Sequence, residues 1–357
     1  MTTSPNPEPL PETIPVREAH RFPTERLADL LTARLGARLG DIRQMRGGQS
    51  NPTFLLGTDR GEYVLRKQPP GQLLPSAHAV DREYRVLTAL AGTDVPVPRP
   101  LLFCDDRDVI GTPFYVMERL KGRVFWSPAL PEVPREGRRA IYMGMNEALA
   151  RLHLVDWEAA GLSGFGKPGN YYARQIARWS KQWPQSKTRE NPSIDCLVEW
   201  LPRHIPPGDE TAICHGDFRL DNMVFHPTEP RVIGILDWEL STLGHPLADL
   251  AYNCICYNTS PNVYKGLLGL DLEGLGIPSQ DEYLRAYYDH TRRRDGITPF
   301  HLAFALFRLA VILEGVLARA RAGNAASSEA EQVGSLGLAL ADRAWELVQQ
   351  QFGHSVS

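Results

Sequence analysis

Three polar side chains whose chemistry suits a group-transfer site follow one another in the second half of the sequence. Asp217 and Asn222 share the run His215-Gly-Asp-Phe-Arg-Leu-Asp-Asn222, and Asp237 ends the apolar run that comes next. A carboxylate in a loop can accept or orient a hydroxyl proton, while an amide oxygen and a second carboxylate are hard ligands that Mg²⁺ prefers. Phosphoryl transfer needs this combination of positioning, metal charge and proton acceptor. The spacing therefore favours phosphoryl transfer over the alternative that these side chains only cap turns.

The elements that must position these side chains are mainly helical after residue 122. Two short apolar runs, 212–214 and 232–236, flank the polar loop and are predicted to be strands. Apolar residues at helical spacing predict helices over 138–154, 171–183, 194–201, 280–292, 301–319 and 334–351.

The first part of the chain has a different pattern. After a helix over 27–39, short apolar runs separated by turn residues predict strands at 42–45, 54–57, 63–66, 101–105 and 114–118, with one helix over 76–91. This order predicts an α+β lobe in which the helix packs on an antiparallel sheet. We therefore expect a flexible tail over 1–15, a lobe over 16–119, a hinge near 118–122 and a larger lobe over 120–357.

The motif His-Gly-Asp followed by Asn222, with a strand ending in Asp237, resembles the aminoglycoside phosphotransferase and choline kinase branch of the protein-kinase-like fold. The resemblance implies a bilobal α+β fold with a small antiparallel-sheet N-lobe and a larger, mainly helical C-lobe. It implies that Asp217 is the catalytic base and that Asn222 and Asp237 bind Mg²⁺. ATP would be the phosphoryl donor.

The same resemblance implies nucleotide-binding residues in the N-lobe. A turn between the first two strands corresponds to the loop that covers phosphates in kinases, although a hairpin turn explains it equally well; its residues are Gly48, Gln49, Ser50 and Asn51. The backbone near Glu118 and Leu120 would bond the adenine edge.

Two adjacent basic residues, Arg66 and Lys67, are candidates for the cation that pairs with the nucleotide phosphates. Alignment on the kinase motif V-A-I-K selects Arg66, and strand alternation sends Lys67 to the other face of the sheet. We favour Arg66, with Lys67 as the alternative and Glu83 on the following helix as the partner. An arginine departs from the usual lysine, because its planar fork binds phosphate differently from a point charge.

Further matches imply supporting residues. His153, His215 and Asp249 are expected to brace the catalytic loop by hydrogen bonds rather than to react. Gly216 replaces the arginine of the protein-kinase motif, and the segment from Asp237 to Asp249 is too short for a phosphorylated activation loop. We expect a small-molecule kinase that needs no activation by phosphorylation.

The acceptor is indicated by a closer resemblance over 63–82 and 172–183, which are similar to the kinase-like module fused to some acyl-CoA dehydrogenases. It implies phosphorylation of a hydroxyacyl-CoA, at the 4-position, with an acyl-CoA dehydrogenase as partner. Arg174, Arg178 and Lys181 recur at helical spacing and could bind the coenzyme A phosphates, although a solvated helix face is the alternative. A pocket for a polycationic aminoglycoside would instead need carboxylates.

Composition excludes several other classes. The chain has 357 residues, with 39 Lys and Arg against 42 Asp and Glu, and this balance argues against a dedicated nucleic-acid binder. Five cysteines without a C-x-x-C pair argue against a disulfide framework or a zinc site. Without a recognisable signal peptide or membrane span, we expect a cytoplasmic protein. The alternatives are an antibiotic kinase and a nucleotide-binding pseudokinase module.

Overall fold

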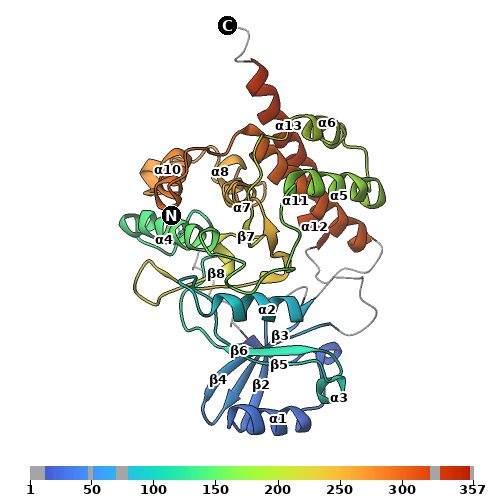
Figure 1. Ribbon diagram of the computed structural model, residues 1–357, viewed down its shortest axis with the longest axis vertical. Coiled ribbons are helices and arrows are strands. Elements are labelled where there is room, and N and C mark those ends of the chain that lie inside the picture. Colours follow the sequence, from blue (N-terminus) through green and yellow to red (C-terminus); the bar gives the residue numbers. More distant parts are fainter. Residues whose placement is uncertain (1–12, 47–50, 70–78, 322–329, 354–357) are drawn as a thin grey trace, which may run out of the picture. The chain divides into compact units, whose positions relative to one another are not determined.

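The computed structural model divides the chain into two compact units and describes residues 13–46, 51–69, 79–321 and 330–353 (Figure 1). The first unit comprises Met1–Thr88 and Pro98–Arg119, and the second comprises Ala89–Val97 and Leu120–Ser357. The division falls after Arg119, but Ala89–Val97 groups with the second unit. One reason is a backbone hydrogen bond, in which the Ile235 N–H donates to the Pro96 carbonyl at 2.8 Å.

An antiparallel sheet forms the first unit, with the strand order β1-β2-β3-β4-β6-β5. The strands are β1 (Thr13–Ile14), β2 (Leu39–Met45), β3 (Thr53–Thr58), β4 (Gly61–Lys67), β5 (Pro100–Cys104) and β6 (Phe114–Glu118). The expected tail ran to residue 15, whereas Thr13 and Ile14 pair with Met45 and Gln44 of β2. This short strand was not predicted, because two residues are too few to show alternation. Residues 1–12 lie outside the described part of the chain.

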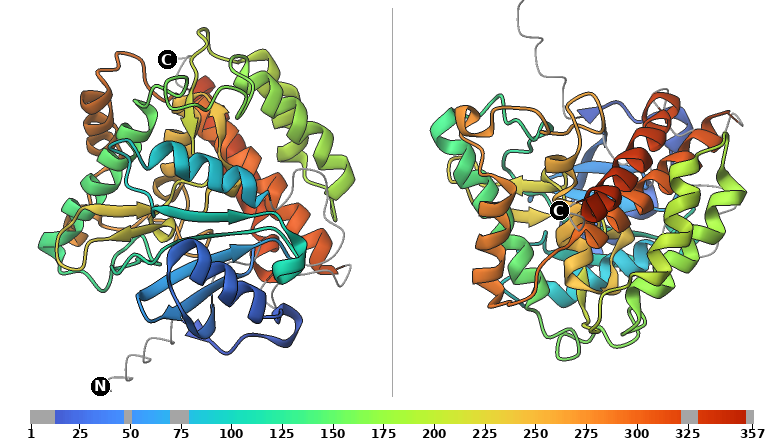
Figure 2. Two further views of the ribbon diagram at one scale, coloured as in Figure 1. Left: turned by 60° about the horizontal axis from the view of Figure 1, so that its bottom comes forward. Right: turned by 90° about the horizontal axis from the view of Figure 1, so that it is seen from above.

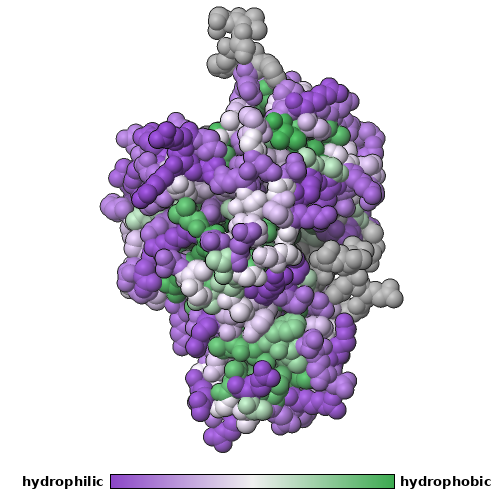
Figure 3. All heavy atoms as spheres, in the orientation of Figure 1, coloured by the Kyte–Doolittle hydropathy of each residue, from purple (hydrophilic) through white to green (hydrophobic). Residues whose placement is uncertain are grey.

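Strand alternation gives the sheet two different faces. On one face Leu65 and its neighbour Val116 join a buried core with Leu27 of α1 (Glu25–Leu35). Arg66 and its cross-strand partner Tyr115 point to the other face. There α2 (Val80–Leu90) packs, with the ring of Tyr84 centred 6.1 Å from that of Tyr115. In the view of Figure 3, apolar side chains gather over the strands of this unit. A short helix, α3 (Arg107–Ile110), precedes β6.

Helices dominate the second unit, as predicted. They are α4 (Arg135–His153), α5 (Tyr171–Ser186), α6 (Pro192–Trp200), α7 (Pro246–Asn253), α8 (Ile255–Asn258), α9 (Leu272–Leu275), α10 (Gln280–Thr291), α11 (Pro299–Arg321), α12 (Ala330–Ser335) and α13 (Gly337–Gly353). The helix expected over 334–351 is divided into α12 and α13. Gly334 and Gly337 lie at the break, and a Cβ on either would clash with backbone atoms of α11 at Leu317 or Ala310. The missing side chains therefore allow close packing against α11.

Helix α11 lies among α5, α7, α12 and α13 and forms the centre of this unit (Figure 2). By length and composition it could cross a membrane, and it is the only helix in the described part of the chain with these two properties. However, 89% of its most apolar window is buried by neighbouring elements. A helix that is apolar all round and covered in this way has the character of a core helix.

Two small antiparallel sheets position the polar loop. Strand β7 (Ala212–Cys214) pairs with β10 (Thr242–Gly244), and β8 (Met223–Phe225) pairs with β9 (Val232–Ile235). The sequence predicts β7 and β9 but neither of their partners. Residues 215–222 run from the end of β7 to the start of β8, so the loop is fixed at both ends by a hydrogen-bonded strand.

Candidate active site

Gly216 makes the turn that begins the polar loop. Its φ is +83°, which L-residues with a side chain rarely adopt. A Cβ at this position would also lie 2.6 Å from the carbonyl oxygen of Leu240. Both the backbone conformation and the close approach therefore require glycine, which explains the residue in structural terms.

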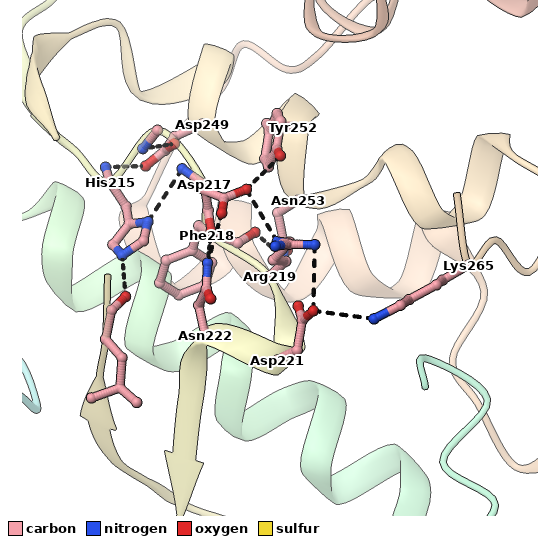
Figure 4. Close-up of polar contacts among 12 residues, drawn as sticks. His215, Asp217, Phe218, Arg219, Asp221, Asn222, Asp249, Tyr252, Asn253 and Lys265 are labelled. Atoms are coloured by element: carbon pink, nitrogen blue, oxygen red, sulfur yellow. Dashed lines mark hydrogen bonds and ion pairs between the residues drawn. The ribbon is translucent and has the colours of Figure 1, made fainter. Parts of the chain in front are cut away.

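The buried carboxylate of Asp249 holds this turn in place (Figure 4). Its two oxygens accept the backbone N–H groups of His215 at 2.6 Å and Gly216 at 2.8 Å. His153 Nε2 lies 3.5 Å from the same carboxylate, and His153 Nδ1 lies 2.6 Å from the Tyr287 hydroxyl. Burial would raise the pKa of Asp249, but its hydrogen bonds with His153 and the Gly216 N–H lower that pKa below its usual value. Asp249 is therefore ionised, and its carboxylate stabilises the turn through these hydrogen bonds.

His215 ties the loop to the strand end that carries Asp237. Its Nε2 lies 2.8 Å from the Leu236 carbonyl oxygen and must donate a hydrogen bond there. Its Nδ1 accepts the N–H of Asp217 at 3.2 Å. A neutral imidazole with the proton on Nε2 satisfies both contacts, so this histidine supports the loop and is not placed to transfer a proton.

The carboxylate of Asp217 is held on both oxygens. Asn222 Nδ2 donates to Oδ2 at 2.8 Å and to the Asp217 carbonyl at 2.9 Å. The Tyr252 hydroxyl donates to Oδ1, and Arg219 Nε lies 3.1 Å from the same atom. The side chain is thus locked in one orientation while remaining partly exposed, as a group that must meet a hydroxyl requires.

Arg219 also pairs with a second carboxylate. Its guanidinium lies 3.3 Å from Asp221, and Lys265 Nζ lies 3.4 Å from the same oxygen. Burial would lower the pKa of Arg219, but the charges of Asp217 and Asp221 raise it well above its usual value. The guanidinium therefore stays charged between the two carboxylates (Figure 4).

Asn222 and Asp237 lie side by side at the ends of paired strands. The Leu236 N–H donates to the Asn222 carbonyl at 2.8 Å, so Asp237 follows directly beside Asn222. Because the amide nitrogen of Asn222 is spent on Asp217, its amide oxygen is the atom available to a cation. Asp237 has a left-handed φ of +64°, a strained conformation of the kind that clusters at functional sites. An amide oxygen and a carboxylate from neighbouring backbone positions are ligand types that fit a hard cation such as Mg²⁺.

Helix α7 contributes more to the site than the sequence indicates. Asp249, Tyr252 and Asn253 share one face of it, and Asn253 Nδ2 donates to the Phe218 carbonyl at 3.0 Å. Tyr252 and Asn253 were not predicted. They follow Asp249 by three and four residues, a helical spacing that could have identified them as neighbours on the same face. Arg308 of α11 was missed as well; its guanidinium donates to the Gly216 carbonyl at 2.9 Å. No local pattern marks a contact over such a sequence distance.

In the first unit, Glu83 of α2 is the centre of a second polar cluster. It is 1% exposed and lies 2.9 Å from Arg66 Nε. It also accepts hydrogen bonds from Asn51 Nδ2 at 2.7 Å and the Tyr115 hydroxyl at 3.0 Å. Lys67 lies on the opposite face, with its ammonium 4.9 Å from the ring centre of Phe22. Of the two basic candidates, Arg66 is therefore the one that pairs with Glu83.

The other predicted nucleotide-binding residues are placed differently. Gly48, Gln49 and Ser50 lie outside the described residues. The N–H of Glu118 donates to the Arg99 carbonyl at 3.0 Å, and its side chain accepts the Arg99 N–H at 2.8 Å. Leu120 begins the main segment of the second unit.

The predicted basic stripe lies on α5. Arg178 and Lys181 are exposed, while Arg174 donates to the Lys167 carbonyl at 2.6 Å. Across the described part of the second unit, no hydrogen bond or ion pair joins this stripe to Asp217.

Comparison with known proteins gives a consistent result. The phosphotransferase enzyme family matches residues 41–283. Acyl-CoA dehydrogenase family member 10 of Mus musculus is 43% identical over 96% of this chain, which spans about a third (33%) of that relative. A Ralstonia eutropha crystal structure, named provisionally as an aminoglycoside phosphotransferase, is 45% identical, with a TM-score of 0.84 over 92% of this chain and 99% of that one.

A more distant structure shows the fold alone. A mutant of aminoglycoside phosphotransferase APH(4)-Ia, solved with AMP-PNP and hygromycin B, is 15% identical with a TM-score of 0.58. It covers 89% of this chain and 98% of that one. These likenesses confirm the predicted kinase-like fold, with its antiparallel-sheet part and its helical part.

The geometry of Gly216 leads to a stability prediction. We expect Gly216→Ala to lower the free energy of unfolding by clearly more than Gly208→Ala, which also has a positive φ but meets nothing within 4 Å. The control carries only the left-handed backbone cost of about 1–2 kcal/mol. Urea denaturation of both variants measures the difference, and equal losses would contradict the role given to the Leu240 carbonyl.

The two basic residues of β4 allow a second test. Arg66→Met leaves the Glu83 carboxylate buried without its cation and should cost about 3–5 kcal/mol of unfolding free energy. Lys67→Met removes a charge whose burial lowers the pKa of that lysine, and should change stability little. A larger loss in Lys67→Met than in Arg66→Met, in the same denaturation experiment, would reverse our assignment of the Glu83 partner.

Proposed function

Because the chain belongs to the phosphotransferase enzyme family, as a small-molecule kinase with a hydroxyl acceptor, we propose that it transfers the γ-phosphoryl group of ATP to a hydroxyacyl-CoA. The preferred position is the 4-hydroxyl. The observation that carries the proposal is the fixed carboxylate of Asp217, which is hydrogen-bonded to Asn222, the residue whose backbone carbonyl accepts the N–H directly before Asp237.

In the proposed reaction the acceptor oxygen forms a bond to the γ-phosphorus, and the bond from that phosphorus to the β–γ bridging oxygen breaks. The electron pair of the broken bond stays on ADP. Asp217 takes the hydroxyl proton as the new bond forms, which is worth about 10²–10⁴-fold in rate. Asn222 and Asp237 would hold Mg²⁺, which neutralises phosphate charge when bound. Asn222 also keeps Asp217 in position through its amide nitrogen.

Nucleotide binding is proposed for the first unit. Arg66, held by Glu83, is the cation for the phosphates, and Asn51 is a positioning residue because it is buried and bonded to Glu83. Gly48, Gln49, Ser50 and Leu120 remain proposed nucleotide contacts. The backbone N–H of Glu118 already donates to the Arg99 carbonyl within the first unit, so Glu118 is proposed to contribute less directly to nucleotide binding.

The acceptor proposal is supported by the names of the relatives. The mouse relative is named as an acyl-CoA dehydrogenase, and this chain corresponds to about a third (33%) of its length. A dehydrogenase that handles acyl-CoA would be a natural partner for a kinase acting on the same thioester. The exposed cations Arg178 and Lys181 are proposed to bind the phosphates of coenzyme A.

A second candidate acceptor is an aminoglycoside, which the name of the Ralstonia eutropha structure favours. Both candidates use the same loop and differ only in the acceptor, so one assay separates them.

The catalytic prediction concerns Asp217. We expect release of ADP from ATP and Mg²⁺ in the presence of 4-hydroxyacyl-CoA, and not with kanamycin. Asp217→Asn keeps the shape of the side chain but loses its basicity, and should lower kcat about 10²–10⁴-fold. Asp156→Asn is the matched control, because the exposed side chain of Asp156 accepts only the backbone N–H groups of the turn that follows it. Undiminished turnover in Asp217→Asn would rule this residue out as the base.

The metal prediction concerns Asp237. Asp237→Asn removes one negative charge and should raise the Mg²⁺ concentration needed for half-maximal activity, since Mg²⁺ binds carboxylates more strongly than amides. A Mg²⁺ titration of activity, together with electron paramagnetic resonance of Mn²⁺ bound in the presence of ADP, measures the effect. The same metal dependence in Asp156→Asn and Asp237→Asn would argue against Asp237 as a ligand.

A further inference from the structure

The loop that follows α8 is closed on itself and strained at its tip. The Leu268 N–H donates to the Thr259 carbonyl at 2.9 Å, which joins the two ends of the loop. At the tip, Tyr264 and Lys265 both have a φ of +53°. Two consecutive non-glycine residues in the left-handed region are unusual, and such strain is retained where it serves a purpose.

The strained pair sends two neighbouring side chains to the catalytic loop. Tyr264 lies close to Tyr252, whose hydroxyl donates to Asp217. The ammonium of Lys265 lies 3.4 Å from Asp221 of the polar loop. Its half-buried position gives Tyr264 a role in folding, which an exposed lysine at the same strained turn does not share.

Lys265 lies next to an exposed aromatic ring. Its ammonium is 5.8 Å from the ring centre of Trp126, and the tryptophan is 61% exposed. The side chain of Lys265 is itself 56% exposed. Its ion pair with Asp221 is long and reaches solvent, and pairs of this kind contribute little to stability, so an incoming anion can share the ammonium at small cost. Leu268 of the same loop is exposed as well.

We propose that Lys265 and Trp126 form an acceptor-binding site, in which the ammonium binds a carbonyl or carboxylate oxygen of the acceptor and the indole packs against its carbon chain. This inference rests on the proposed function and defines its substrate class. A chain of three ion pairs links the ammonium to Asp217: Lys265 pairs with Asp221, Asp221 pairs with Arg219, and Arg219 pairs with Asp217. The bound oxygen therefore lies close to the phosphorylated hydroxyl, as in a short hydroxy acid or its thioester, and not at the distant phosphates of coenzyme A.

The test uses exposed residues, whose replacement should leave the fold intact. Lys265→Ala, Lys265→Glu and Trp126→Ala are compared with Lys187→Ala, which removes another exposed lysine that pairs with one carboxylate, that of Glu190. Isothermal titration calorimetry without ATP measures binding of 4-hydroxyacyl-CoA, the free 4-hydroxy acid and coenzyme A alone. Turnover assays give KM for the acceptor and for ATP.

We expect Lys265→Glu to weaken binding of both the thioester and the free acid by about tenfold or more, because a charge-assisted hydrogen bond becomes a repulsion. Trp126→Ala should also weaken binding of the thioester. Binding of coenzyme A alone and KM for ATP should be unchanged in these variants, and the Lys187→Ala control should bind the thioester and the free acid as the unaltered protein does. A response to the free acid as well as the thioester identifies the carboxyl-derived oxygen as the group that is bound.

Unchanged acceptor affinity in Lys265→Glu and Trp126→Ala would overturn the site even if the enzyme phosphorylates the thioester. Lys265-dependent binding without any turnover would uphold the site and reject the proposed activity. Failure of the unaltered protein to bind either the thioester or the acid would overturn both.

Discussion

The carboxylate of Asp249 accepts two consecutive backbone N–H groups, those of His215 and Gly216, and the geometry of the polar loop depends on this contact. A buried charge is costly unless it is paired and fully hydrogen-bonded. Here His153 and the two amides meet that need, so the same contacts that stabilise the carboxylate also fix the turn. Because Asp249 belongs to α7, the helix then presents Tyr252 to Asp217 and Asn253 to the Phe218 carbonyl.

Glu83 has the same relation to the first unit. It too is a buried carboxylate, and it collects a guanidinium, an amide and a phenol from β4, the segment before β3 and β6. In each unit one acidic side chain on a helix therefore organises polar groups from several other elements. A hydrophobic side chain of similar size could fill the same space, but it could not orient hydrogen-bonding groups in this way.

Local patterns were sufficient to predict the elements that carry those candidate site residues which lie close together in sequence. The spacing of Asp217, Asn222 and Asp237 reflects a single strand-loop-strand unit, and strand alternation correctly separated Arg66 from Lys67. Contacts between distant segments had no such signal. The donation from Arg308 to the Gly216 carbonyl and the pairing of Thr13 with Met45 depend on tertiary packing, which periodicity does not encode. Most helix positions were predicted because amphipathic spacing is local, whereas β8 and β10 are too short for alternation to show.

The close approach of Gly216 to the Leu240 carbonyl has an evolutionary consequence. Glycine and arginine codons can differ by a single nucleotide, so a mutation could in principle introduce the arginine through which many protein kinases respond to phosphorylation. In this chain the new side chain would meet the backbone at Leu240 and force the turn out of its left-handed conformation. Acquiring that form of control would require the segment around Leu240 to be rebuilt first. A single backbone contact thus keeps this form of control beyond the reach of one substitution at position 216.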